Sequence, residues 1–277
     1  MSIVWLNGRL VPAAEAVVPA LDRGVLWGYG LFETMRVYGG RVWALDEHLQ
    51  RLGRGGEVIG VKVPAPEAIG RALSDVLRAN NLADAGVRVT LTAGTGSPDP
   101  HAEISGSPNV LATAWALADY RELYERGAAF VTLPGGGRPL AGVKTTSYAA
   151  SVAGRVLAQR AGADDALFCG EDGRVLEGTG SNVFAVRGDL LVTPPLTDHL
   201  LPGVTRRHVL DVASHAGLRT AEVPLSLDDL FTSDEVIFTS SLREVYPARS
   251  IDGREVGRGA VVDKLRDAYR NAVLKSL

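Results

Sequence analysis

The sequence has almost no cysteine and no long apolar run, and each shortage excludes a class of protein. Cys169 is the only cysteine among 277 residues, so the chain cannot form an internal disulfide, and this fits a reducing compartment. No stretch reaches the roughly 18 apolar residues of a membrane-spanning helix, and the N-terminus lacks the basic and apolar regions of a signal peptide. We therefore expect a cytoplasmic protein with no membrane partner.

Neither sign of charge is in marked excess. The 29 Lys+Arg residues face 32 Asp+Glu residues, for a formal net charge of -3, so a nucleic acid or an anionic surface is not an expected partner. Hydrophobic residues make up 46% and charged residues 22% of the chain, which describes a globular protein with material for one or two cores.

The pattern of expected strands and helices divides the chain into two halves. Residues 1–115 alternate β-rich runs with two helical patterns and indicate a small α+β domain. Residues 116–126 carry charges without strand character and are expected to connect it to a second domain, residues 127–277, in which strands dominate and helices pack outside. We expect strands at 3–6, 31–38, 87–92, 110–115, 129–133, 165–169, 175–186, 190–193 and 235–238, and helices at 45–59, 66–80, 147–161, 204–216 and 259–274.

Lys144 is one of only four lysines and lies in a segment of small and apolar residues, Gly142–Ala150. An ammonium among Val143, Ala149 and Ala150 would lose hydration, which lowers the pKa of a lysine and leaves more neutral amine to attack a carbonyl. Taken alone, the segment fits a solvated lysine at a helix start better. Lys144 is therefore a candidate Schiff-base amine whose role depends on the rest of the chain.

Two segments have the features of anion sites. Leu201–Arg206 precedes a helical pattern, so the backbone amides of Val204 and Thr205 and the Thr205 hydroxyl would face an anion at the helix start. The hydroxyl cluster of Thr239–Ser241 follows an apolar strand, where loops commonly hold ligands. A capped Pro/Gly turn explains the first segment without any ligand.

Two charged residues complete the candidate site. Glu177 lies on an otherwise apolar strand, where a buried carboxylate needs a partner such as a protonated pyridine nitrogen or an internal arginine. Arg51 lies three residues after His48 on one helical face, and its planar fork suits a phosphate, although a helix arginine can also be merely solvated.

Together and in this order, the motifs resemble the class IV aminotransferases, the pyridoxal-phosphate (PLP) enzymes of fold type IV. The resemblance covers nearly the whole chain. The segments that carry it are Asp22–Gly24, Gly28–Thr34, His48–Leu52, Lys144, Glu177–Phe184, Pro202–Thr205 and Ser240–Ser241.

This resemblance implies roles for individual residues. Lys144 would form the Schiff base with PLP and move the proton between the substrate α-carbon and the cofactor. Glu177 would pair with the pyridine nitrogen, and Tyr148 would bond the phenolic oxygen. The cup for the phosphate would consist of Arg51, Val204, Thr205, Ser240 and Ser241.

The resemblance also implies an architecture. It predicts an α+β fold with a small N-terminal α/β sandwich and a larger C-terminal domain that resembles a β-barrel with outer helices. It further implies a homodimer, an active site near the domain junction and no metal.

Substrate choice is less well defined by the sequence. D-amino-acid transaminases of this family trap the substrate carboxylate with an Arg-x-His loop, but here Asp99 stands about where the arginine should be, and it would repel a carboxylate. Other residues could bind substrate instead, and each arginine among them could equally be a structural ion-pair partner. They are Tyr29, Arg36, Arg88 and Arg243.

Three functions remain open at this point. The first is an aminotransferase that moves an amino group between an amino acid, of D or branched-chain type, and a 2-oxo acid. The second is an aminodeoxychorismate lyase that makes 4-aminobenzoate and pyruvate with the same lysine and cofactor. The third is a catalytically silent relative, against which the presence of Lys144, Glu177 and Arg51 argues.

Overall fold

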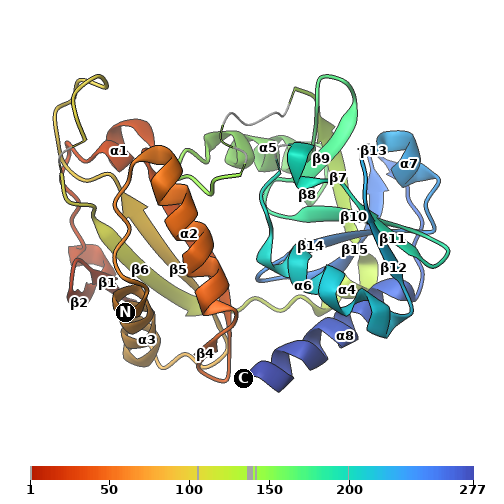
Figure 1. Cartoon of the computed structure of the whole chain (residues 1–277), viewed down its shortest axis with the longest axis horizontal. Coiled ribbons are helices and arrows are strands. Elements are labelled where there is room, and N and C mark those ends of the chain that lie inside the picture. Colours follow the sequence, from red (N-terminus) through yellow and green to blue (C-terminus); the bar gives the residue numbers. More distant parts are fainter. Residues whose placement is uncertain (1, 105, 136–139, 141, 199) are drawn as a thin grey trace. The chain divides into compact units, whose positions relative to one another are not determined.

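A computed structural model describes residues 2–104, 106–135, 140, 142–198 and 200–277 (Figure 1). The chain divides into two compact units. Unit 1 comprises residues 1–118 and 143–148, and unit 2 comprises residues 119–142 and 149–277. The short segment that contains Lys144 thus belongs to unit 1, although unit 2 residues flank it on both sides in the sequence. The division into domains at residues 115 and 127 stays a prediction.

Unit 1 is built on a six-stranded sheet in the order β2-β1-β6-β5-β3-β4, in which every neighbouring pair is antiparallel. Its elements are β1 (Ile3–Leu6), β2 (Arg9–Pro12), η1 (Ala13–Glu15), α1 (Arg23–Trp27), β3 (Gly30–Tyr38), β4 (Arg41–Val42), α2 (Leu45–Ile59), α3 (Pro66–Ala79), β5 (Ala85–Thr92) and β6 (Val110–Ala116).

The core of unit 1 forms where α2 and α3 pack on the sheet. Alternate residues of β3, among them Leu31, Met35 and Val37, are buried in one apolar cluster with Leu49 and Leu52 of α2. This is the expected result of a period of two in a strand and a period of 3.6 in an amphipathic helix. The intervening residues of β3, including Phe32, point to the opposite face of the sheet.

Unit 2 is built on a ten-stranded mixed sheet in the order β12-β11-β10-β14-β15-β7-β8-β9-β13, with β16 paired to β15. Its elements are α4 (Arg121–Arg126), β7 (Ala128–Leu133), α5 (Ala149–Arg160), β8 (Asp165–Cys169), β9 (Arg174–Gly178), β10 (Asn182–Arg187), β11 (Leu190–Thr193), η2 (Leu196–Asp198), α6 (Val204–Val212), η3 (Ala213–Ala216), β12 (Arg219–Glu222), β13 (Leu225–Ser226), α7 (Leu227–Phe231), β14 (Glu235–Ser240), β15 (Glu244–Ile251), β16 (Arg254–Glu255) and α8 (Val261–Ser276).

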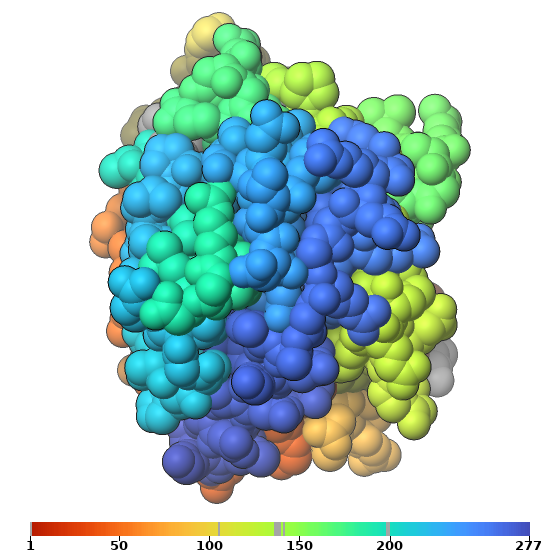
Figure 2. Space-filling model, turned by 90° about the vertical axis from the view of Figure 1, so that its right-hand side faces the viewer, coloured from red at the N-terminus to blue at the C-terminus, as the bar shows by residue number. Residues whose placement is uncertain are grey.

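The core of unit 2 is aromatic at its centre. The rings of Phe130 and Phe238 stack with centroids 3.8 Å apart, and the ring of Tyr246 lies 6.1 Å from that of Phe238. The C-terminal helix α8 packs on β15 and α6, and it is the dark blue segment on the surface in Figure 2. Among the helices of the described residues, none has the length and apolar character needed to cross a membrane.

Some of the observed elements differ from those expected from the sequence. The single strand expected at 175–186 is wrong, because residues 179–181 turn the chain between the separate strands β9 and β10. The expected helix at 147–161 begins only at Ala149, because Thr145 and Thr146 pair with β3 instead. The expected connection contains the helix α4.

Candidate active site

Backbone pairing with β3 holds Lys144 in unit 1. The Phe32 amide donates to the Lys144 carbonyl at 3.0 Å, and the Thr146 amide donates to the Gly30 carbonyl at 2.9 Å. The Thr146 hydroxyl also donates to the Gly28 carbonyl at 2.6 Å. Residues 144–146 therefore lie along the edge of β3, and the position of Lys144 is determined by the sheet.

The surroundings of the Lys144 amine differ from the predicted apolar shell. Ala149 and Ala150 are exposed, whereas Val143 packs against the core of unit 1 and Lys144 itself is half-buried. The Lys144 Nζ atom lies 4.6 Å from the centre of the Phe32 ring, whose π face attracts an ammonium. The apolar group beside the amine is therefore Phe32, and not Ala149 or Ala150 as predicted.

Two further predicted residues meet at the same phenylalanine. The guanidinium carbon of Arg88 lies 3.7 Å from the Phe32 ring centre, and the Tyr148 ring meets Phe32 edge-on at 5.3 Å. Burial lowers the pKa of Arg88, while Tyr148 and Glu33 act in the opposite direction. Lys144 and Tyr148, four residues apart, thus surround one ring together with the distant Arg88.

Arg51 is engaged by a buried carboxylate. Its Nε and Nη2 atoms donate to the two carboxylate oxygens of Glu33, each at 2.7 Å, and His48 Nδ1 lies 2.7 Å from Glu33 Oε2. Burial alone would raise the pKa of Glu33, but Arg51 and His48 bring it well below its usual range. Burial lowers the pKa of His48, so Nδ1 of a neutral imidazole donates to the carboxylate.

Tyr29 and Arg36 lie apart from the Phe32 cluster in their contacts. The Tyr29 hydroxyl donates to the Ile59 carbonyl at the end of α2. The Arg36 guanidinium carbon lies 4.8 Å from the centre of the Tyr38 ring, two residues along β3. In the loop that follows β5, the Asp99 carboxylate accepts from the His101 amide at 2.9 Å.

In unit 2, Glu177 is held by the loop that precedes α6. The Leu201 amide donates to Glu177 Oε2 at 3.2 Å, and the Asn182 side-chain amide approaches the same oxygen at 3.4 Å. Asn182 also donates to the Leu201 carbonyl at 3.1 Å, so one amide joins the carboxylate to the loop. Glu177 is buried, with 5% of its surface exposed, so its carboxylate needs hydrogen-bond donors from the protein in place of water.

The start of α6 combines backbone donors with a close contact. Val204 and Thr205 are buried in its first turn, and α6 has no side-chain cap among the residues that the structure describes. A Cβ atom on Gly203 would lie only 2.0 Å from Asn182 Oδ1, so glycine is required there by space rather than by backbone angle. Such an uncapped first turn leaves backbone N–H groups available, and its binding of an anion stays a prediction.

The turn between β14 and β15 carries the last predicted residues. Ser240 and Ser241 are half-buried, and Ser240 Oγ accepts from the Arg243 amide at 3.3 Å. Arg243 Nη1 lies 3.8 Å from Asp165 Oδ2, and the pKa of Arg243 is raised by Tyr246 and then by Asp165. Arg243 therefore has a buried anionic partner within unit 2.

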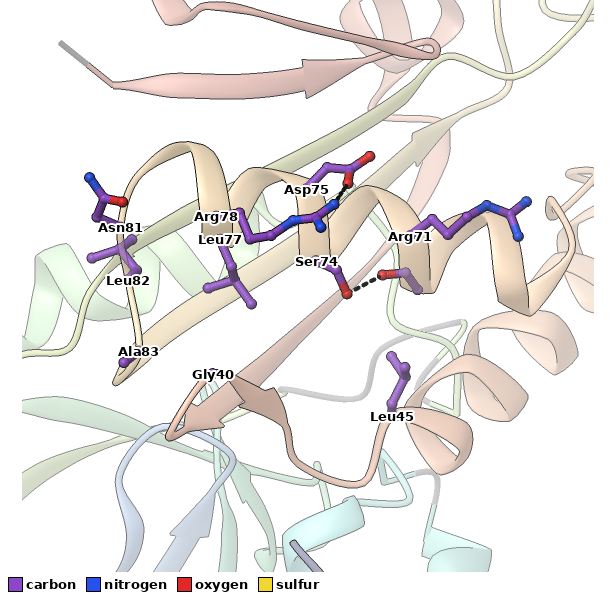
Figure 3. A pocket seen from close by; sticks show the side chains of 11 residues that line it. Gly40, Leu45, Arg71, Ser74, Asp75, Leu77, Arg78, Asn81, Leu82 and Ala83 are labelled. Atoms are coloured by element: carbon purple, nitrogen blue, oxygen red, sulfur yellow. Dashed lines mark hydrogen bonds and ion pairs between the residues drawn. The ribbon is translucent and has the colours of Figure 1, made fainter.

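A surface groove of unit 1 contains none of the predicted residues. Figure 3 shows it between α3 and the turn that joins β3 to β4, and three of its polar side chains bond to each other or to their own helix. Arg78 pairs with Asp75, and the Ser74 hydroxyl donates to the Gly70 carbonyl at 3.0 Å. The groove offers no constellation for amine chemistry.

The residues that the motif analysis passed over are Phe32, Glu33 and Asn182. All three lie inside the motifs, but nothing in their local sequence shows that Phe32 faces Lys144 or that Asn182 reaches Gly203. Those relationships arise from strand pairing and from the loop before α6.

Comparison with known proteins places the chain in a family. The family model described as amino-transferase class IV matches residues 30–251. The chain belongs to the class IV aminotransferases. It is therefore a transferase that uses PLP, the cofactor of this family, and the predicted function of moving an amino group is confirmed at that level.

Relatives of this class IV aminotransferase carry two kinds of name. A provisionally assigned branched-chain-amino-acid aminotransferase of Methanocaldococcus jannaschii is 33% identical over 97% of this chain and 95% of that protein. The D-alanine aminotransferase of Bacillus licheniformis is 32% identical over 98% of this chain and 97% of that protein. Neither name favours the lyase.

The fold of the class IV aminotransferase also matches a solved structure. The branched-chain aminotransferase of the archaeon Thermoproteus uzoniensis, solved with norvaline, superimposes with a TM-score of 0.90, 31% identity, and coverage of 99% of this chain and 95% of that one. The predicted α+β fold of type IV, with its strand-rich second half, is confirmed.

Proposed function

We propose that Lys144 is the residue that bonds to the aldehyde of PLP and then acts as the base at the substrate α-carbon. The observation that carries the proposal is the pairing of residues 144–146 with β3, which holds the amine 4.6 Å from the Phe32 ring centre. When bound, PLP supplies a cationic ring that accepts electrons from the substrate carbanion. The residues of the chain then have to orient that ring, hold its phosphate and bind the substrate.

Glu177 fits the pyridine nitrogen of PLP. A ring cation needs a carboxylate that stays ionised while buried, and the donors from Leu201 and Asn182 to Oε2 favour the ionised form. Both donors meet the same oxygen, which orients the carboxylate as a whole. In this proposal, Glu177 keeps the ring protonated, and Tyr148 binds the phenolic oxygen.

The phosphate of PLP fits the start of α6 and the hydroxyls near it. Val204 and Thr205 supply first-turn amides that no side chain caps among the described residues, and Ser240 and Ser241 supply hydroxyls from the same unit. We assign Arg51 to the phosphate as well. Its pairing with Glu33 fixes the plane of its guanidinium. A guanidinium held in this way can direct an N–H donor toward the phosphate.

The substrate is proposed to be an amino acid of branched-chain type, paired with a 2-oxo acid. Two relatives carry that name, and Arg88 lies beside the ring that faces Lys144, where it could bind a carboxylate. Arg36, Arg243 and Tyr29 are further substrate contacts in the proposal. The D-alanine aminotransferase relative supports a D-amino acid as the second candidate, although Asp99 stands in the loop where that class carries arginine.

A homodimer is also proposed, because apolar side chains of α1 are open to solvent in the single chain. Val25 is 62% exposed, and Leu26 and Trp27 are each more than a third exposed. Burying such a cluster against a second copy would remove it from water. Light scattering of the purified protein would give the mass directly, and a monomeric mass at micromolar concentration would contradict the proposal.

The cytoplasm is the proposed location. Cys169 is a free, buried thiol, and burial raises its pKa to about 11, so it stays protonated and unreactive. Cell fractionation would test this assignment.

The experiment that tests the proposed function follows the visible spectrum of the PLP-loaded protein. L-leucine, L-glutamate, D-alanine and D-glutamate are added in separate cuvettes, followed by a 2-oxo acid. We expect L-leucine and L-glutamate to bleach the band and the 2-oxo acid to restore it. Bleaching by the D-amino acids alone would move the second candidate to first place, and no response to any donor would contradict both.

A further inference from the structure

Asp165 is a buried carboxylate in unit 2 that none of the motifs includes. It is the first residue of β8, lies opposite Phe130 of β7, and is only 1% exposed. An ionised carboxylate removed from water is costly unless other groups of the protein pair with it. The identity of those partners therefore shows what the carboxylate holds together.

The Ala166 amide of the same strand donates to Asp165 Oδ1 at 2.9 Å, and the other partners come from three other segments of unit 2. The Thr179 hydroxyl donates to Asp165 Oδ1 at 2.5 Å, and Arg155 Nε lies 3.7 Å from the same oxygen. Arg155 also donates to the Thr179 hydroxyl at 3.2 Å, which closes a small ring of contacts. Arg243 Nη1 lies 3.8 Å from the other oxygen, Oδ2, close enough for an ion pair but too far for a hydrogen bond.

Each of these partners follows a segment that the proposed function assigns to the cofactor. Thr179 comes two residues after Glu177, and Arg243 comes two residues after Ser241. Arg155 lies on α5, the helix that begins directly after Tyr148. Asp165 thus contacts a residue that follows each of the three segments, but it is part of none of them.

The strand that carries Asp165 lies in the interior of the sheet. β8 pairs with β7 on one side and with β9 on the other, and all five of its residues are buried. The Thr179 amide also donates to the Ala166 carbonyl at 3.1 Å, so the turn after Glu177 is attached to β8 by backbone as well as by side chain.

We propose that Asp165 is a positioning residue that holds the Glu177–Thr179 turn, the Ser240–Arg243 turn and α5 in the arrangement that binds PLP. The proposal rests on the proposed function, because it takes those segments to be the cofactor site. In this proposal Asp165 has no direct contact with the cofactor. It acts through Thr179, Arg243 and Arg155.

Asp165→Asn is the direct test, because asparagine keeps the shape and one acceptor oxygen but removes the charge that both arginines face. The control is Glu235→Gln, a second buried carboxylate, 3% exposed, at the opposite end of β14 from Ser240. Glu235 accepts from the Val261 and Val262 amides at the start of α8, and among the described residues none of its side-chain hydrogen bonds reaches the three segments. The two variants therefore lose similar charges in different places.

The readouts are the melting temperature, the dissociation constant for PLP and the split between KM and kcat. We expect both variants to melt earlier, but only Asp165→Asn to bind PLP more weakly, by roughly tenfold, with kcat reduced at saturating cofactor. Equal PLP affinity in the two variants would overturn the proposal and leave Asp165 a purely structural residue.

Thr179→Val keeps the test decisive if Asp165→Asn does not fold. Valine fills the same volume at this buried position and removes only the hydroxyl that Asp165 Oδ1 accepts from. We expect weaker PLP binding with a nearly unchanged fold, and unchanged PLP affinity would overturn the proposal. Failure of the unmodified protein to bind PLP through Lys144 would instead contradict the proposed function, so the two failures can be told apart.

Discussion

Glu33 and Arg51 form a bidentate ion pair inside unit 1. Arg51 Nε donates to Glu33 Oε1 and Arg51 Nη2 donates to Glu33 Oε2, both at 2.7 Å. Glu33 is completely buried and Arg51 is 6% exposed, so neither charge has water as an alternative partner. The pair joins β3 to α2, and the proposed function needs Arg51 in one orientation.

Glu33→Gln should therefore destabilise the protein strongly. It leaves the Arg51 charge buried without its anion, which costs about 3–5 kcal/mol of unfolding free energy. Asp75→Asn is the matched control, because it breaks the exposed Asp75–Arg78 pair, and such pairs contribute at most about 1 kcal/mol. Urea unfolding measures both. Similar small losses in the two variants would show that the buried pair contributes little.

The stability contributed by Glu33 should disappear in acid. Arg51 and His48 hold the pKa of Glu33 far below its usual range in the folded protein, so the unfolded chain takes up a proton first as the pH falls. The contribution is fully present above about pH 4.5, the ordinary pKa of a glutamate, and is lost as the pH falls toward the folded pKa. The stability difference between the unmodified protein and Glu33→Gln should shrink as the pH falls below about 4.5. A difference independent of pH down to 3 would contradict this reasoning.

Two glycines of α2 should respond in opposite directions to alanine. A Cβ on Gly53 meets nothing within 4 Å, so Gly53→Ala should stabilise the helix by about 0.5–1 kcal/mol. A Cβ on Gly56 would lie 2.5 Å from Val63 Cγ2 and 2.6 Å from the Val61 carbonyl, so Gly56→Ala should destabilise. Thermal unfolding of the pair is the measurement. A Gly56→Ala protein as stable as the Gly53→Ala protein would show that the packing of α2 is looser than the structure indicates.

Gly203→Ala should weaken PLP binding through Asn182. The new Cβ would occupy space 2.0 Å from Asn182 Oδ1, which must move, and its amide would then leave Glu177 Oε2. Asn182→Ala removes the side chain that the new Cβ would clash with. Gly203→Ala should therefore weaken PLP binding less in the Asn182→Ala protein than in the unmodified protein. A double-mutant cycle on the PLP dissociation constant measures this coupling. Strictly additive effects would contradict the link between Asn182 and Gly203.

Local periodicity was sufficient for much of the fold. The strong amphipathic pattern of residues 45–59 predicted α2 with its observed bounds, and the strands 3–6, 165–169 and 190–193 were also predicted as they occur. β15 was missed, because Pro247 and Arg249 interrupt its apolar pattern, although Pro247 lies opposite Ile237 within the sheet. The break at residues 179–181 was missed because a Gly- and Ser-containing turn between two apolar runs does not alter their hydrophobicity.

For the candidate site, the sequence predicted residue types but not the contacts between distant segments. The residue types of Lys144, Glu177 and Arg51 suggested their chemistry from sequence, and the family resemblance supplied roles for them. The contact of Lys144 with Phe32 depends on an edge pairing with β3 more than 100 residues earlier in the sequence. The partners of Asp165 come from α5 and two turns, which no local pattern brings together.

The most direct test of the central claim is to locate the residue that carries PLP. The PLP-loaded protein is reduced with borohydride, which converts a Schiff base into a stable secondary amine, and is then digested and analysed by mass spectrometry. The phosphopyridoxyl group should be found on Lys144, and Lys144→Ala should lose it while keeping the melting temperature of the fold. A label on Lys62, Lys264 or Lys275 instead, or full turnover by Lys144→Ala, would contradict the account.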